Sequence, residues 1–206
     1  FRIDLTNRII GLNSHLNIYS FDNEITNKQA DELILNIDNS FFYQHYKSIE
    51  TNGLIIKSNN SKGVMIKGYD AYDKNHYLFN SINMGSLIQN PKSEILIGDS
   101  LANEMNLSVG DKVKIAIPKT DKTILGNIPR FKTLEVVGVF DLGLYEYDSN
   151  LIFLSSELVR KLLLYEEDIY NKIEFFTLSP NEIELFKNKV ELEISNLLLN
   201  FYSISW

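Results

Sequence analysis

The segment from Pro118 to Phe140 is the feature that most constrains the fold, because it places a long polar stretch between two strand-like runs. The run Val113–Ile117 predicts a strand that stops at a proline, and Thr133–Phe140 predicts the returning strand. Connections this long inside a compact domain are usually functional or disordered. Apolar residues within the stretch argue against disorder. We therefore predict a docking arm, the hook loop 118–131, on a protein that acts by holding another protein.

Seven residues of this arm are candidates for binding a partner. Arg130 follows Pro129, whose ring restricts the backbone, and arginine is enriched at interface hot spots. The alternative interpretation of Arg130 is a solvated charge at a strand end. The apolar residues of the arm form either an exposed contact set or a small core beneath the loop. The predicted partner-binding residues are Pro118, Lys119, Ile124, Leu125, Ile128, Pro129 and Arg130.

Composition and charge exclude several classes of function. The net charge of −7 and the scattered basic residues argue against a broad nucleic-acid interface. The chain has no cysteine, so a disulfide, a thiolate nucleophile and a cysteine-ligated zinc site are all impossible. It has three histidines, and no two of them share a helical or short-motif spacing. We predict no enzyme activity, no cofactor and no metal site.

One acidic cluster offers an alternative chemistry. Asp141, Glu146 and Asp148 are compatible with acid–base work or with a cation site. No nucleophile, histidine or phosphate-binding loop accompanies them, so a structural turn over Gly143–Asn150 is the favoured interpretation. The histidines are predicted as a polar strand residue (His15), an exposed strand residue (His45) and a helix-surface residue (His76).

The pattern of elements predicts an α+β fold with two lobes. Strand–helix–strand patterns occur at both ends of the chain, with a different block between them. We predict one lobe from residues 1–70 and 151–206, and an inserted, mainly β lobe from residues 71–150 that carries the arm. Within these lobes we expect strands at Phe41–Ile49 and Gly53–Ser58 with a turn between them, a hairpin turn at Asn59–Gly63, and helices from Thr26 or Asn27, at Ala71–Gln89, after Ser155 or Ser156 and from Pro180.

The sequence shows neither a membrane-spanning segment nor a targeting signal. No apolar run approaches the roughly 18 to 20 residues that a spanning helix needs, and no signal peptide is apparent. Because the chain starts at Phe1 and not at methionine, we expect it to be a piece of a longer protein.

Four motifs in the chain resemble those of a known family. They are Gly11–Leu16, Ile97–Val113, the Pro-Arg loop Thr123–Arg130, and Val136–Asp148. Together they are similar to the large periplasmic domain of the lipoprotein-releasing ABC-transporter permeases, the LolC/LolE family, which is itself similar to the MacB-like periplasmic core. The resemblance covers most of residues 8–165. The arm departs from the family pattern at Ile124–Leu125, and the part after Asp168 carries no family motif.

The resemblance implies a fold, a location and a set of partners. The fold is a porter-like lobe with an inserted second lobe, and the domain lies at the periplasmic face of the bacterial inner membrane, as an excised soluble domain of a multi-pass membrane protein. The permease releases lipoproteins and passes them to a soluble periplasmic carrier of the LolA type, which a protruding hairpin holds. The implied partners are that carrier, the lipoprotein substrate, a second permease subunit (the same or homologous) and cytoplasmic ATPase subunits.

Three other functions compete with this hypothesis. One is a macrolide-exporter-type or cell-division-type permease domain that pairs subunits or binds another periplasmic partner. Another is a soluble hydrolase, which would need a clustered catalytic set. The third is a domain that only pairs two permeases, and this one would tolerate deletion of the arm.

Overall fold

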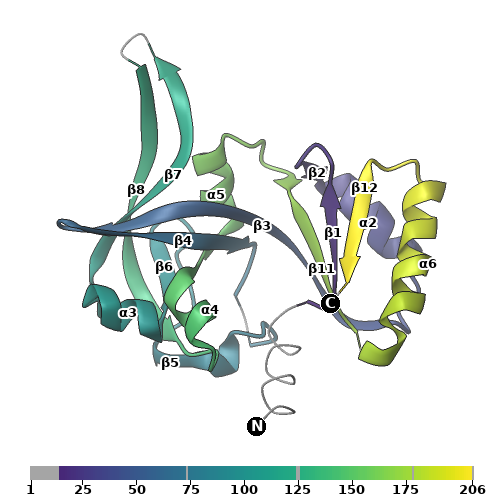
Figure 1. The fold of residues 1–206 in the computed structure, drawn as a ribbon, viewed down its shortest axis with the longest axis horizontal. Coiled ribbons are helices and arrows are strands. Elements are labelled where there is room, and N and C mark those ends of the chain that lie inside the picture. The colour runs from purple at the N-terminus through teal and green to yellow at the C-terminus, as the bar shows by residue number, and fades with distance from the viewer. Residues whose placement is uncertain (1–13, 73, 124–125, 178, 206) are drawn as a thin grey trace. The chain divides into compact units, whose positions relative to one another are not determined.

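The structure is a computed structural model that describes residues 14–72, 74–123, 126–177 and 179–205; the side chains of 118–129 and of Pro180 lie outside the described set. Figure 1 shows its elements. The strands are β1 (Leu16–Ser20), β2 (Ile25–Thr26), β3 (Phe42–Lys57), β4 (Asn60–Tyr69), β5 (Ile82–Gly85), β6 (Glu94–Gly98), β7 (Lys112–Thr123), β8 (Gly126–Phe140), β9 (Leu151–Ser155), β10 (Ile169–Tyr170), β11 (Lys172–Thr177) and β12 (Phe201–Ser205). The helices are α2 (Asn27–Asn36), α3 (Asp99–Met105), α4 (Tyr145–Asn150), α5 (Ser156–Leu163) and α6 (Ile183–Asn196), with short 3₁₀ turns η1 (Phe79–Ser81) and η2 (Pro180–Glu182).

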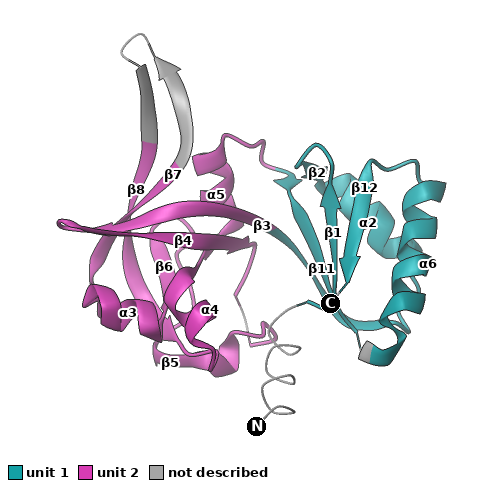
Figure 2. Ribbon diagram, in the orientation of Figure 1, with its two compact units in different colours: residues 1–48, 168–206 teal, residues 49–167 magenta. Residues whose placement is uncertain are grey.

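Contacts divide the chain into two compact units, coloured separately in Figure 2. Unit 1 comprises Phe1–Ser48 and Asp168–Trp206, and unit 2 comprises Ile49–Glu167. These boundaries differ from the predicted lobe limits at residues 70/71 and 150/151. The difference arises because β9 pairs with β4 on one side and with β6 of the predicted inserted lobe on the other, which places all three strands in unit 2.

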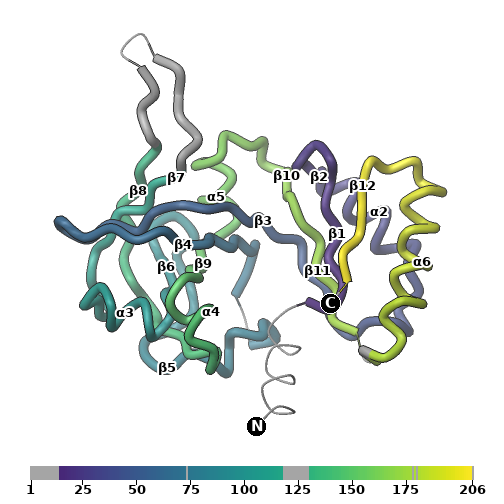
Figure 3. The backbone as a smooth tube through the Cα atoms, in the orientation of Figure 1, coloured from purple at the N-terminus to yellow at the C-terminus, as the bar shows by residue number. Residues whose placement is uncertain are grey.

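Unit 1 is an antiparallel sheet with helices packed on one face. The strand order is β12-β1-β11 followed by the first part of β3, and Figure 3 shows β1 lying between β11 and β12. Alternate residues of β1 and β11 enter the core beneath the helices, because successive side chains of a strand point to opposite faces. The helix α2 begins with a capping box, in which the Thr26 hydroxyl accepts from the Gln29 amide at 3.2 Å. Leu16, Ile18, Ile173, Phe175, Phe186 and Val190 are among the core residues.

Unit 2 is a mixed sheet with α3, α4 and α5 attached. The order is β4-β9-β6-β8-β5, with the second part of β3 beside β4, and β7 pairs with both β3 and β8. The β4–β9 and β6–β8 pairs are parallel. The strands β6 and β9 read as continuous apolar runs because their side chains are buried on both faces. Ile55, Ile66, Ile97, Ile115, Val136, Phe140 and Phe153 form part of this core.

Several predicted elements are wrong at the level of local structure. The expected turn at residues 51–53 is instead the middle of the continuous strand β3. A Cβ built on Gly53 would lie 2.7 Å from the Ala116 carbonyl oxygen, so this glycine permits the close approach of β7. The hairpin between β3 and β4 is confirmed, but its turn lies at Ser58–Asn59 and not at Asn59–Gly63 as predicted, with a positive φ of 53° at Ser58.

Two further predictions fail for tertiary reasons. The expected helix at Ala71–Gln89 is, in its described residues, loop with η1 and β5, and β5 adds to the edge of β8. The expected turn at Gly143–Asn150 contains α4. The carboxylate of Asp148 accepts hydrogen bonds from the backbone N–H groups of Leu142 and Leu144, just before the helix begins. Residues 118–131, expected to form a loop, belong to the strands β7 and β8. Residues 124–125 lie outside the described residues.

Candidate functional site

The predicted partner-binding arm is described only at its base. The side chains of Pro118, Lys119, Ile128 and Pro129 lie outside the described residues, as do Ile124 and Leu125 entirely. Their role therefore stays a prediction. Among the predicted residues, the structure describes the side chain of Arg130, and the backbone of Arg130 pairs with that of Ile117 between β7 and β8.

Arg130 reaches from the arm to a neighbouring helix. Its side chain is half-buried, and its Nη1 donates to the carbonyl oxygen of Lys161 at 3.1 Å. Lys161 lies in the last turn of α5, where carbonyl groups lack partners within the helix. A cation at this end also interacts favourably with the helix dipole. Arg130 is thus held against the domain.

Next to Arg130, an apolar row crosses three strands, with exposed side chains at both ends and the buried Ala116 between them. Leu54 on β3 is opposite Ala116 on β7, and Ala116 is opposite Phe131 on β8. Residues directly opposite in antiparallel strands share one face of the sheet. Phe131 is 53% exposed and Leu54 is 45% exposed, and Met65 on the neighbouring β4 is 44% exposed. The sequence analysis missed this row; the signal available was an aromatic residue, Phe131, between two basic residues.

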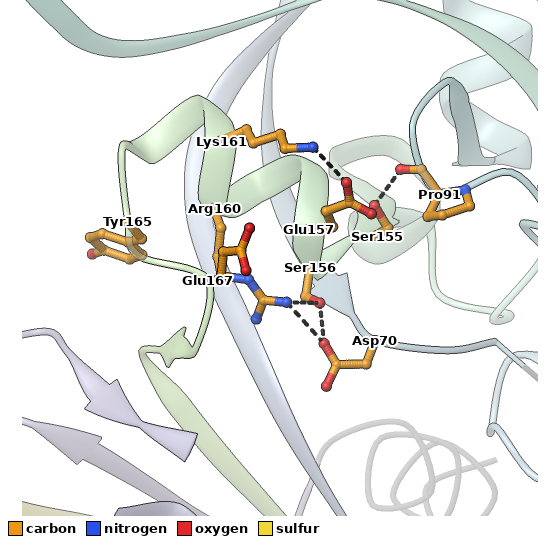
Figure 4. Close-up of a pocket in the computed structure, with 9 residues that line it drawn as sticks. All are labelled: Asp70, Pro91, Ser155, Ser156, Glu157, Arg160, Lys161, Tyr165 and Glu167. Atoms are coloured by element: carbon orange, nitrogen blue, oxygen red, sulfur yellow. Dashed lines mark hydrogen bonds and ion pairs between the residues drawn. The ribbon is translucent and has the colours of Figure 1, made fainter. Parts of the chain in front are cut away.

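The helix α5 also lines a pocket of about 380 Å³ within unit 2, shown in Figure 4. The guanidinium of Arg160 is the central group. Its Nη2 lies 3.1 Å from the Ser156 Oγ and 3.3 Å from a carboxylate oxygen of Asp70, and Ser156 also donates to that carboxylate. The wall is completed by Pro91, Ser155, Glu157, Lys161, Tyr165 and Glu167.

This pocket has the chemistry of an ion-pair network. Lys161 pairs with Glu157 at 2.5 Å, one helical turn away, and this lysine holds the pKa of Glu157 below its usual range by hydrogen bonding. Ser156 has an arginine and a carboxylate as neighbours, and the always-charged guanidinium cannot serve as a general base. The arrangement fixes the start of α5 against Asp70.

The acidic cluster proves structural. Asp148 is buried, and its two carboxylate oxygens accept from the amides of Leu142 at 2.8 Å and Leu144 at 3.1 Å. Burial raises the pKa of Asp148 above its ordinary value, assisted by the nearby Asp141 and opposed by these two hydrogen bonds. Among the described residues, no three histidines or acids are grouped so as to hold a metal ion.

A pH titration tests this role of Asp148. Because its folded pKa is raised, the folded state holds the proton more tightly than the unfolded state. Its contribution to stability is therefore full below about pH 3.9 and is lost as the pH rises through the raised value. We expect the difference in free energy of unfolding between the parent chain and Asp148→Asn to change in favour of the variant from pH 4 to pH 7. Urea unfolding at several pH values measures it, and a flat difference contradicts it.

Two histidines lie in the interior. His15 is buried, and its Nδ1 accepts from the Thr177 amide at 2.9 Å, which ties the start of β1 to the end of β11. His76 is also buried, and it packs between Tyr72 and Tyr77. The predicted helix-surface position of His76 is therefore wrong, because the helix is absent. His45 is exposed on β3, as predicted.

Known proteins match this chain in part of its sequence and share its fold over nearly its whole length. Curated relatives include the lipoprotein-releasing system transmembrane protein LolC of Xylella fastidiosa strain 9a5c, 31% identical over 93 residues, which are 44% of this chain. LolC of Neisseria meningitidis serogroup B is 32% identical over 76 residues, or 37% of this chain. The matched segments span 22% and 18% of the length of these relatives. No protein-family profile matches the chain.

Two solved structures share the fold over nearly the whole chain. The periplasmic region of MacB from Actinobacillus actinomycetemcomitans superposes with a TM-score of 0.59, covering 100% of this chain and 94% of that one, at 16% identity. The extracellular domain of the ABC-type transporter YknZ from Gram-positive bacteria also gives 0.59, covering 92% and 99%, at 11% identity. None of the described helices is long and apolar enough to cross a membrane. The chain is thus similar to LolC over part of its sequence, and it shares the fold of the MacB and YknZ domains.

Proposed function

We propose that this domain belongs to a lipoprotein-releasing permease and that its β7–β8 arm holds a soluble periplasmic lipoprotein carrier of the LolA type. The observation that carries the proposal is the set of sequence matches to proteins named LolC, at 31 to 35% identity. The location that follows is the periplasmic face of the inner membrane. The remaining partners are a second permease subunit, cytoplasmic ATPase subunits and the lipoprotein itself.

The chemistry around the arm supports a protein-binding role. Phe131, Leu54 and Met65 expose apolar area on one sheet face at the base of the arm. Aromatic residues surrounded by polar groups are the usual anchors of protein interfaces. We therefore add Phe131 as a contact to the predicted set of Pro118, Lys119, Ile124, Leu125, Ile128, Pro129 and Arg130.

In this proposal the domain performs no chemistry. ATP hydrolysis in the cytoplasmic subunits moves the domain, and the lipoprotein passes to the carrier held on the arm. Affinity comes from a few buried anchors. Charged side chains of unit 2 form ion pairs with one another, such as Lys57–Asp111 and Lys161–Glu157. These pairs suit a domain that acts by binding and movement.

A binding titration with a purified LolA-type carrier tests the proposal. Replacing residues 119–129 by a tight Asn-Gly turn is expected to weaken binding by about 100-fold, which corresponds to about 2.7 kcal/mol, because the principal anchors are removed. A folded, shortened chain that binds as tightly as the parent contradicts the proposal and favours a domain that pairs permease subunits. Absence of binding by the folded parent chain also overturns it.

A second pair of variants tests the contact face. Phe131→Ser is expected to weaken carrier binding about 10-fold or more, because an aromatic anchor is lost. Phe79→Ser is the matched control, since Phe79 is also in unit 2 and is 48% exposed, against 53% for Phe131. Equal losses in the two variants would remove Phe131 from the contact set.

A further inference from the structure

The end of α5 carries a complete backbone cap, to which Arg130 of the arm adds a further hydrogen bond. Leu164 adopts the left-handed conformation, with a φ of 61°, and the Tyr165 amide donates to the Arg160 carbonyl at 2.9 Å. The second bond of this type of cap, from the Leu164 amide to the Lys161 carbonyl, is long at 3.4 Å. Arg130 donates to that same carbonyl at 3.1 Å. The Lys161 carbonyl oxygen therefore accepts from two donors, the Leu164 amide of the cap and the Arg130 guanidinium of the arm.

Strand alternation separates Arg130 from its neighbour Phe131. Arg130 is opposite the buried Ile117. Phe131 is opposite Ala116, which is also buried, but it shares its face of the sheet with Leu54, and both of these side chains are exposed. Successive residues of a strand point to opposite faces. Arg130 consequently turns toward the packed side of the sheet and α5, while Phe131 turns toward the face that is open to a partner.

We propose that Arg130 is a positioning residue, which fixes the base of the β7–β8 arm on the C-terminus of α5 and thereby holds the arm ready for its partner. The effect of Arg130 on carrier binding rests on the proposed function. The contact between Arg130 and α5 does not depend on a carrier. This inference differs from the hot-spot interpretation, in which the guanidinium itself contacts the carrier. Positioning acts by raising the population of the binding-competent arm.

Amide hydrogen exchange tests the structural part of this proposal in the free chain. Arg130→Gln is expected to speed exchange of the Leu164 and Tyr165 amides by at least fivefold, because the cap loses its charged donor. Lys132→Gln is the matched control, since it removes the same charge two residues along β8 from an exposed position. Arg130→Lys should restore part of the protection. Unchanged exchange in Arg130→Gln, or an equal change in Lys132→Gln, overturns the proposal.

Binding kinetics with the same carrier test the consequence. Loss of a positioning residue lowers the association rate constant, because fewer molecules are competent, and leaves the dissociation rate constant within about twofold. Loss of a direct contact mainly raises the dissociation rate constant. A faster dissociation with unchanged association therefore overturns the proposal. If the parent chain binds no carrier, the proposed function fails, and the exchange measurement still decides whether Arg130 anchors the arm.

Discussion

Replacing Gly98 by alanine is expected to lower the free energy of unfolding by about 3 kcal/mol, the upper end of the usual cost of overpacking. Gly98 ends β6 and precedes α3. A Cβ at this position would lie 2.1 Å from the Asp148 carbonyl oxygen and 2.6 Å from its Cα. These are backbone atoms of α4, so no side-chain rotation can relieve the clash, and α4 must move away from β6.

Gly63→Ala provides the matched control in the same unit. Gly63 is an exposed residue of β4, and a Cβ built there meets no atom within 4 Å. Alanine in a strand is about 0.5–1 kcal/mol more favourable than glycine, so this variant should be neutral or slightly more stable. Urea unfolding of both variants measures the difference. A loss below about 1 kcal/mol for Gly98→Ala would show that α4 accommodates the methyl group.

Glu174→Gln is expected to destabilise the chain by about 3 kcal/mol, because removing one partner of a buried ion pair leaves the other charge uncompensated. Glu174 is 1% exposed and lies 3.4 Å from the Nζ of Lys172, which is 5% exposed. Ser14 lies 3.3 Å from the same carboxylate oxygen, and the Lys172 Nζ lies 5.6 Å from the centre of the Tyr19 ring. The pair occupies the face of the unit 1 sheet opposite its helices.

A double substitution separates two effects of Glu174→Gln: the loss of attraction between Glu174 and Lys172, and the cost of leaving the Lys172 charge buried. Lys172→Met with Glu174→Leu removes both charges, and apolar replacements of a buried pair are often neutral or stabilising. The double variant should therefore recover most of the stability lost in Glu174→Gln. The control is Glu157→Gln in the exposed pair with Lys161, where a loss of about 0.5 kcal/mol or less is expected. Urea unfolding that gives equal losses for both single variants would contradict the buried-charge argument.

The sequence predicted those elements that depend on neighbouring residues. Thr26 caps α2 and Ser155 caps α5, as expected, because an N-cap needs only a hydroxyl beside the first turn. The strands β1, β6 and β12 follow from their composition and alternation. The motif resemblance led to a LolC/MacB-like periplasmic domain, and the comparisons confirm this part.

Features that depend on distant residues were not predictable from local pattern. Gly53 resembles a turn residue in the sequence, but it lies mid-strand because β7 passes beside it. His76 has a polar sequence environment, yet it is buried among tyrosines once the loop packs against β4 and β9. Asp148 looked like part of an exposed turn and is instead the acceptor that organises the entry to α4.

The sequence by itself thus determined the α+β class and the helix caps and pointed to the similarity with LolC, because these rest on short-range pattern and on motifs. Only the tertiary structure decided the direction of each side chain at the base of the arm. Arg130 and Phe131 are adjacent in the sequence, and both suit a binding site. Pairing of β8 with β7 sends Arg130 toward α5 and Phe131 toward the exposed face, because a pleated strand alternates its side chains and the partner strand sets which face is buried.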